Sequence, residues 1–131
     1  MTNKQLLTIN SCPCGWGEYA TCCGRYHDGM PAPDAESLMR SRYSAYVLKL
    51  ESYLLATWHL DTRPANLNLE SESTKWLGLE VKNHAQQSAD RATVEFVARY
   101  KVNGRAHRLQ EVSRFVLEEG RWFYLDGSFP A

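Results

Sequence analysis

A two-residue turn in the second half of the chain constrains the fold more than any other feature. Asn103-Gly104 follows the segment "RATVEFVARYKV", in which apolar and polar residues alternate as they do in a half-buried strand. Asn-Gly favours a type I′ hairpin turn because both residues tolerate positive φ angles. Since a two-residue turn fixes which residues face each other, the sequence predicts a hairpin together with its register.

The predicted register gathers one set of side chains on a single face. Counting outward from the turn pairs Val102 with Arg105, Tyr100 with His107, Ala98 with Leu109, Phe96 with Glu111, Val94 with Ser113 and Ala92 with Phe115. A similar turn at Glu119-Gly120 would pair Trp122 with Leu117, Tyr124 with Phe115 and Asp126 with Ser113. Two carboxylates, Glu111 and Asp126, are therefore expected on the same face as several aromatic rings.

Helical periodicity precedes these strands. "GMPAPDAE" is a predicted linker, and Asp34 stands where a helix N-cap is expected. From Ala35 to Leu50 apolar residues recur at helical spacing along one face, and a second short helix is expected to reach about Trp58. Strands are expected from about Trp76 onward. Helices followed by an antiparallel sheet predict an α+β domain.

All four cysteines lie in "CPCGWGEYATCCGRYH", residues 12–27, which we call the cysteine segment. In a reducing compartment, closely spaced cysteines are more often metal ligands or catalytic groups than disulfides. Four thiolates complete the tetrahedral shell that zinc prefers. The sequence therefore predicts a zinc site formed by Cys12, Cys14, Cys22 and Cys23.

Three alternatives to this zinc site remain open. The two cysteine pairs could form cross-linked disulfides, although neighbouring Cys22 and Cys23 could bridge each other only in a strained ring. One thiol could be reactive, with His27 as its base. His27 could also replace Cys23 as the fourth ligand, or it could be an ordinary surface histidine.

Charge and hydropathy exclude several classes of partner. The 131 residues include 15 basic and 15 acidic ones, so no net field attracts nucleic acid or an anionic membrane. The N-terminus lacks the apolar run of a secretion signal, and no stretch is long enough to span a bilayer. We expect a cytoplasmic protein without nucleic-acid or membrane partners, and the oligomeric state stays open.

The two inward carboxylates, Glu111 and Asp126, need partners if they are buried. The candidate partners are Arg42, His59, Arg63 and the hydroxyls of Tyr43 and Tyr46. Such a pocket would suit acid–base chemistry, but the same contacts often only anchor a helix to a sheet. The sequence contains no nucleophile elbow and no phosphate-binding glycine loop, so no catalytic residue is predicted.

The cysteine segment resembles the SEC-C motif, a zinc knuckle found at the C-terminus of the bacterial preprotein translocase ATPase. The family pattern, C-x-C and then C-C or C-H, maps onto Cys12, Cys14, Cys22 and Cys23. In the translocase this knuckle contacts a protein partner through a surface that includes basic residues. Glu18 and Ala20 replace the usual lysines here, which weakens the inference of an equivalent partner.

The order of the elements resembles the nuclear-transport-factor-2-like (NTF2-like), or cystatin-like, fold, in which a bent sheet wraps a helix and leaves a conical pocket. With "SLMRSRYSAYVLKLESYLLATWH" and "LQEVSRFVLEEGRWFYLDG", nearly the whole chain is similar to the YchJ family of uncharacterised bacterial proteins. The resemblance implies a SEC-C-type zinc knuckle over residues 1–30 and an NTF2-like domain over residues 31–131.

Three functional hypotheses follow. The first is a cytosolic zinc-binding interaction module, whose knuckle binds a protein partner and which has no enzymatic activity. The second is a small enzyme or ligand-binding protein that acts in the conical pocket, because this architecture hosts both. The third is a redox role for Cys22 and Cys23.

Overall fold

The chain folds into a few helices and one four-stranded sheet, and its computed structural model describes residues 11–71 and 73–130. The elements are η1 (Tyr19–Thr21), α2 (Cys23–His27), α3 (Ala35–Leu48), α4 (Glu51–Ala56), η2 (Leu69–Ser71), β1 (Lys75–Ser88), β2 (Arg91–Val102), β3 (Arg105–Glu118) and β4 (Arg121–Ser128). The first ten residues of the expected knuckle, including most of the N-terminal stretch searched for a secretion signal, lie outside the described residues, as does Ala131. None of the described helices has the length and apolarity needed to cross a membrane.

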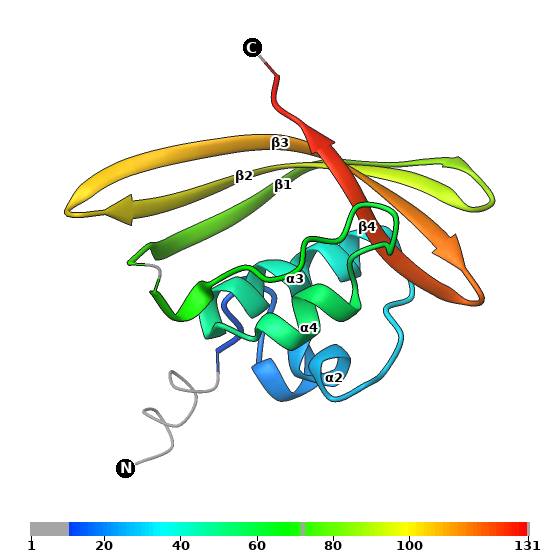
Figure 1. Cartoon of the computed structure of the whole chain (residues 1–131), viewed down its shortest axis with the longest axis horizontal. Coiled ribbons are helices and arrows are strands. Elements are labelled where there is room, and N and C mark those ends of the chain that lie inside the picture. Colours follow the sequence, from blue (N-terminus) through cyan, green and yellow to red (C-terminus); the bar gives the residue numbers. More distant parts are fainter. Residues whose placement is uncertain (1–10, 72, 131) are drawn as a thin grey trace.

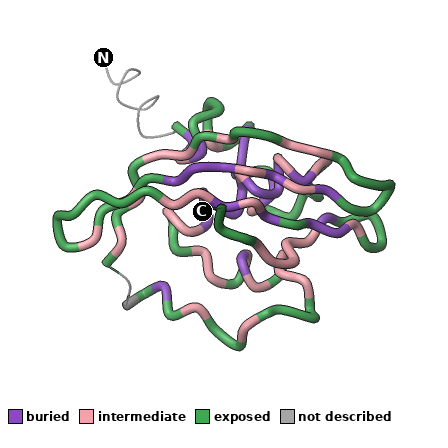
Figure 2. The backbone as a smooth tube through the Cα atoms, turned by 90° about the horizontal axis from the view of Figure 1, so that it is seen from above, coloured by how far each residue is buried: buried purple, intermediate pink, exposed green. Residues whose placement is uncertain are grey.

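The four strands are antiparallel and follow each other in the order β1-β2-β3-β4. The sheet bends, and α3 lies between it and the layer formed by α2 and α4 (Figure 1). The buried positions of β2 and β3 lie within these strands, and the terminal residues of both strands are exposed or half-buried (Figure 2). The predicted α+β class is confirmed.

The register predicted for the first hairpin is also confirmed. All six predicted pairs between β2 and β3 occur. Asn103 and Gly104 have φ angles of 52° and 79°, and Glu119 and Gly120 have φ angles of 52° and 81°. Positive φ at both central residues is the signature of the type I′ turn, so both turns form as the sequence indicated.

One predicted pair between β3 and β4 is wrong. Leu117 faces Trp122 and Phe115 faces Tyr124 as expected, but beyond this point Asp126 faces Arg114 and not Ser113. The register shifts there because β4 carries one extra residue in a β-bulge. A shift of one residue moves a side chain to the opposite face of a sheet, so Asp126 leaves the face that carries Ser113.

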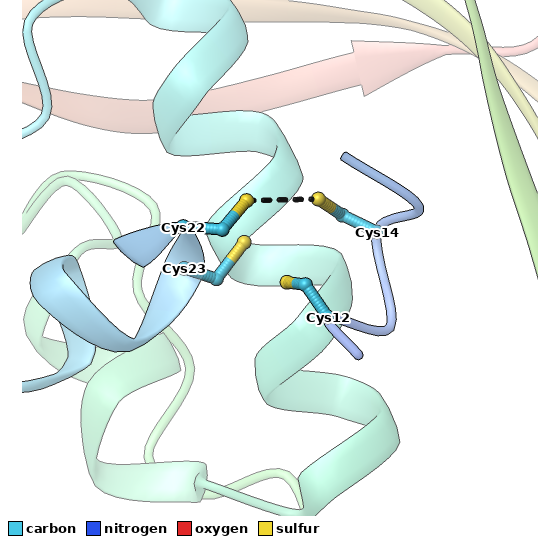
Figure 3. A group of neighbouring side chains, drawn as sticks. All are labelled: Cys12, Cys14, Cys22 and Cys23. Atoms are coloured by element: carbon cyan, nitrogen blue, oxygen red, sulfur yellow. Dashed lines mark hydrogen bonds between the residues drawn. The ribbon is translucent and has the colours of Figure 1, made fainter. Parts of the chain in front are cut away.

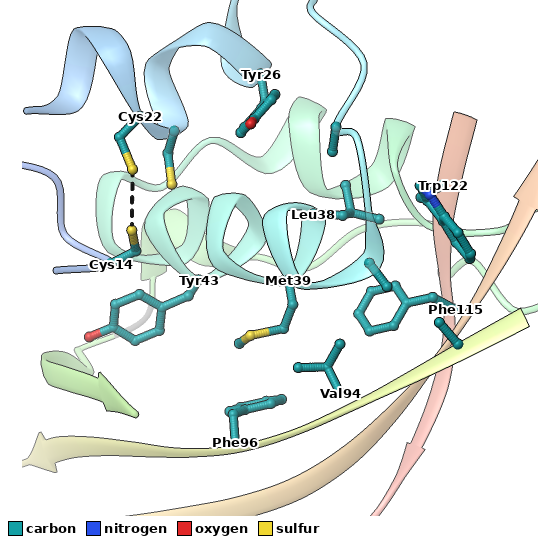
Figure 4. Close-up of a cluster of buried hydrophobic side chains, with 14 of the residues drawn as sticks. Cys14, Cys22, Tyr26, Leu38, Met39, Tyr43, Val94, Phe96, Phe115 and Trp122 are labelled. Carbon is teal, nitrogen blue, oxygen red and sulfur yellow. Dashed lines mark hydrogen bonds between the residues drawn. The ribbon is translucent and has the colours of Figure 1, made fainter. Parts of the chain in front are cut away.

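Helix α3 is buried on two sides. Asp34 caps its start, as predicted, by accepting a hydrogen bond from the Ser37 backbone N–H over 2.7 Å. Met39 and Tyr43 point toward the sheet, while Cys22 lies on the side of the helix away from it (Figure 4). A single hydrophobic cluster includes the four cysteines, α3 and the sheet residues. The cysteine segment is therefore packed into the same core as the sheet.

The second buried side of α3 was not predicted. It includes serines, of which Ser41 and Ser44 are fully buried. The Ser44 hydroxyl lies beside the Cys12 thiol, and the Ser41 hydroxyl contacts the Tyr53 hydroxyl of α4 over 2.7 Å. The sequence showed only the apolar stripe on the other side, because small polar residues at helical spacing are equally typical of a solvent-exposed face.

Candidate functional site

The four cysteines form a compact group of metal-binding type. Their Sγ atoms all lie within 4.8 Å of one another, and those of Cys14 and Cys22 are 3.5 Å apart. All four are buried and free of disulfides, and their side chains point toward one another (Figure 3). Sulfurs about 2.3 Å from a tetrahedral zinc ion stand about 3.8 Å apart, so this donor set fits such an ion.

Two local structures bring the cysteines together. Cys12 and Cys14 lie in a tight turn in which the Cys12 N–H donates to the Gly17 carbonyl over 2.7 Å. Gly15 and Gly17 have positive φ angles of 90° and 139°, which glycine adopts more readily than other residues. The backbone conformation of the turn therefore explains why glycine stands at both positions. Cys22 immediately precedes α2 and Cys23 begins it, which directs two further thiols at the turn.

Close contact among the thiols separates their pKa values. Hydrogen bonding to the neighbouring thiols of Cys14 and Cys23 lowers the pKa of Cys12. The same contact with Cys12 raises the pKa of Cys14 to about 12 and raises that of Cys23 as well. Thiols lose their protons when they become metal ligands, so a cation bound here would displace the protons of Cys14 and Cys23.

Polar contacts anchor the cysteine segment to α3. The Sγ of Cys12 lies 3.5 Å from the Ser44 Oγ. The Nε2 of His27 lies 2.9 Å from the Ser41 carbonyl, which can only accept, so Nε2 carries the hydrogen. In the neutral ring Nδ1 then accepts from the Tyr19 hydroxyl over 2.5 Å. His27 therefore lies in an anchoring contact, and Cys23 belongs to the four-sulfur group.

A second feature is a cavity of about 290 Å³ between α3 and the sheet, which we call the aromatic cavity. Its lining residues are mostly aromatic and come from α3, the segment after α4 and strands β1 to β4. They are Met39, Arg42, Tyr43, Tyr46, Trp58, Trp76, Phe96, Ala98, Leu109, Glu111, Ser113, Phe115 and Tyr124.

Arg42 is the cation of this cavity, and only 6% of it is exposed. Its Nη1 donates to the Leu54 carbonyl over 2.8 Å and to the Thr57 hydroxyl over 2.7 Å. The guanidinium carbon lies 5.0 Å from the ring centre of Trp58 and 4.6 Å from that of Tyr124. Burial lowers the pKa of Arg42, and these two rings partly replace the lost hydration.

Glu111 is the anion of the aromatic cavity and is 9% exposed. Its Oε2 accepts hydrogen bonds from the Ser113 hydroxyl over 2.6 Å and from the Tyr124 hydroxyl over 3.1 Å. Desolvation and the nearby carboxylate raise the pKa of Tyr124, so its phenol keeps its proton and stays a donor. Tyr124 thus contacts both charged groups of the cavity, Arg42 with its ring and Glu111 with its hydroxyl.

Three of the five predicted pocket residues meet at the cavity, namely Arg42, Tyr43 and Glu111. His59 is not among the lining residues, because its Nε2 lies 2.9 Å from Glu118 Oε2 at the end of the β3–β4 hairpin. Asp126 forms two hydrogen bonds with the exposed Arg114, at 2.6 and 2.5 Å.

Sequence reasoning missed Trp58 and Thr57 as parts of the site. The segment after α4 pairs with β4: the His59 N–H donates to the Tyr124 carbonyl, and the Tyr124 N–H donates to that of Thr57. This short parallel bridge places Trp58 on the guanidinium of Arg42. Nothing local in the sequence indicated it, whereas the inward position of Tyr124 followed from the predicted register.

The fold and the cysteines define an α+β protein with an NTF2-like domain and an N-terminal four-cysteine segment. The model of the middle NTF2-like domain of YchJ matches residues 34–127. A UPF0225 protein of Cupriavidus metallidurans is 61% identical, with 97% of this chain and 96% of that protein covered. For a UPF0225 protein of Methylibium petroleiphilum the identity is 60%, over 88% of this chain and 86% of that protein.

Two solved structures are similar to this one. A SEC-C motif protein of Rhodopseudomonas palustris superimposes with a TM-score of 0.82 at 32% identity, over 92% of this chain and 99% of that one. A SEC-C motif protein of Psychrobacter arcticus gives a TM-score of 0.79 at 31% identity, over 96% and 86%. The chain belongs to the YchJ family, as the sequence resemblance implied.

Proposed function

We propose that this chain is a cytosolic zinc-binding protein whose NTF2-like domain binds a small molecule in the aromatic cavity. The observation that carries the proposal is a cavity lined by aromatic rings into which two opposite charges are built. Its volume of about 290 Å³ is just below the range of about 300–1,000 Å³ that is typical of small-molecule sites, so its ligand should be small.

The proposed zinc site has a structural role. Four buried thiols supply every position of a tetrahedral shell, which leaves no open position for a substrate. The cysteine segment also packs on α3 through Ser44 and His27, so a metal ion there would fasten the segment to the helix.

A cavity-filling variant tests the small-molecule function. Ala98 lines the cavity, whereas Ala106 is exposed on the neighbouring strand. A library of neutral and charged fragments would be screened by ligand-observed NMR against the wild type, Ala98→Leu and the matched control Ala106→Leu. Fragments should bind the wild type and the control, and Ala98→Leu should lose them. Identical binding to all three proteins, or no binding at all, would contradict the proposal.

A protein partner for the knuckle is the second candidate, and one side chain favours it. Trp16 is 58% exposed, and the Arg40 guanidinium lies 3.7 Å from its ring centre. Trp, Tyr and Arg are the side chains most enriched among the residues that dominate binding at protein interfaces, and Trp16 is the exposed member of this pair. In-cell crosslinking should give an adduct that Trp16→Ala abolishes and Phe129→Ala, at another exposed aromatic, keeps. The same adducts for both variants would remove this candidate.

A further inference from the structure

The arrangement of charge in the aromatic cavity specifies a class of ligand, an inference that rests on the proposed small-molecule function. Arg42 and Glu111 line the same cavity and attract each other, yet no ion pair joins them. The ring and hydroxyl of Tyr124 lie between the two groups. Both charges are therefore kept separately available in a largely apolar site, where each favours a complementary ligand group.

The hydrogen-bond donors of Arg42 and of the neighbouring Trp58 favour an anionic ligand group. Both hydrogen bonds of the guanidinium to described residues leave from Nη1, and the Nε–Nη2 edge makes none. That edge is a fork which binds a carboxylate through two parallel hydrogen bonds. The indole Nε1 of Trp58, whose ring packs on the same guanidinium, is buried without a partner among the described residues. Buried donors normally have an acceptor, and here a ligand would supply it.

The acceptor at Glu111 calls for a ligand donor. Both hydrogen bonds that its carboxylate accepts from described residues are on Oε2, which fixes its orientation and leaves Oε1 for another donor. A hydroxyl or an amino group meets this requirement.

The walls of the cavity favour a flat apolar body between these polar ends. Tyr43 and Trp76 meet edge to face, with ring centres 5.7 Å apart, and Phe96 completes this side of the lining. Aromatic rings pack well against such walls, and the volume suits a single ring. We propose that the cavity binds a monocyclic aromatic acid, with its carboxylate on the Nε–Nη2 edge of Arg42 and a hydroxyl or amino group donating to Glu111.

Matched probes test the ligand class on the unmodified chain of 131 residues. Calorimetric titration would compare para-hydroxybenzoate with para-hydroxybenzamide, which has the same shape without the charge, and with benzoate, which lacks the hydroxyl. A charge-assisted pair with a buried arginine should make the acid bind about tenfold or more tightly than the amide. Removal of the hydroxyl should weaken binding by about fivefold.

Variants assign each preference to its residue. Arg42→Met should abolish the preference for acid over amide, and Arg42→Lys, which keeps the charge but loses the fork, should reduce it. Glu111→Gln, which replaces the charged acceptor by a neutral amide, should reduce only the preference for the hydroxyl. A misfolded Arg42 variant would not leave the proposal untested, because the comparison of acid with amide on the wild type can contradict it alone.

The outcomes separate this inference from the function on which it rests. If acid and amide bind equally well and Ala98→Leu loses both, the cavity binds small molecules but the acid class is wrong. The proposed ligand class is also wrong if none of the three probes binds. In that case the neutral fragments of the wider screen still test whether the cavity binds small molecules at all. Binding of the acid that persists in Ala98→Leu would place it outside the cavity and overturn the inference.

Discussion

Glu111 occupies the space that a side chain at Gly127 would need. A Cβ added to Gly127 would stand 2.6 Å from the Glu111 Cδ, closer than real Cβ contacts come. Gly127 does not have a positive φ, so its backbone conformation does not require glycine. The neighbouring carboxylate requires it, and the glycine lets β4 approach close enough for Tyr124 to reach Glu111.

Gly127→Ala should therefore destabilise the protein and disturb the cavity. The added methyl group must displace Glu111 from its two hydroxyl donors, and overpacking of this kind costs about 1–3 kcal/mol. Urea denaturation measures the loss. Gly78→Ala on β1 is the matched control, since a Cβ there meets nothing within 4 Å, and it should change stability by less than about 0.5 kcal/mol. Equal stability of the two variants would show that Glu111 is not held as described.

Metal removal should loosen the N-terminal half of the chain. We expect about one zinc per chain, and thiol titration should detect the four cysteines only after chelation. At a free zinc concentration 1,000 times the Kd, binding stabilises the native state by about 4.1 kcal/mol, so chelation should lower Tm clearly. Protein purified without chelator that contains no zinc and has four reactive thiols would argue instead for redox chemistry.

Substitution of His27 and of Cys23 should have different effects. His27→Ala removes two anchoring hydrogen bonds and should cost about 1–3 kcal/mol of stability while zinc remains bound. Cys23→Ser removes one of the four grouped sulfurs and should lower zinc content or affinity. Zinc content and urea denaturation on the same samples check both. Loss of zinc in His27→Ala with full retention in Cys23→Ser would reverse the assignment.

The pair of Arg114 and Asp126 should contribute to stability only above acid pH. Hydrogen bonding from Arg114 lowers the pKa of Asp126, so the folded state favours the ionised carboxylate. This contribution is present above the carboxyl's ordinary pKa and is lost as the pH falls through its lowered value. Asp126→Asn should thus be slightly less stable than the wild type near neutral pH and equal to it in strong acid. A constant difference at all pH values would contradict this account.

Local patterns predicted the hairpin and its register correctly because turn type and alternation of side chains are both local. The position of Asp126 could not be obtained in the same way. One extra residue in β4 moves the Asp126 side chain to the opposite face of the sheet, and nothing in the local composition marks the β-bulge. The pairing of Thr57 and Trp58 with Tyr124 is equally non-local, so the aromatic cavity was predicted only through Arg42, Tyr43 and Glu111.

The spacing of the four cysteines predicted that their thiols lie together, since zinc coordination restricts which residue types serve as ligands. Their relation to the rest of the molecule was not predicted. Serines on a helix ordinarily suggest solvent, and only tertiary packing shows that Ser41 and Ser44 lie against the cysteine segment.

The position of α3 between two layers has a consequence for the newly made chain. The cysteine segment leaves the ribosome before the helix that covers it, and its thiols then have no buried surface to pack on. They become buried only after α3 has been synthesised. The opposite side of α3 is covered later still, when the strands that follow it have formed the sheet. Early capture of a metal ion by the nascent thiols would protect them from oxidation during this interval.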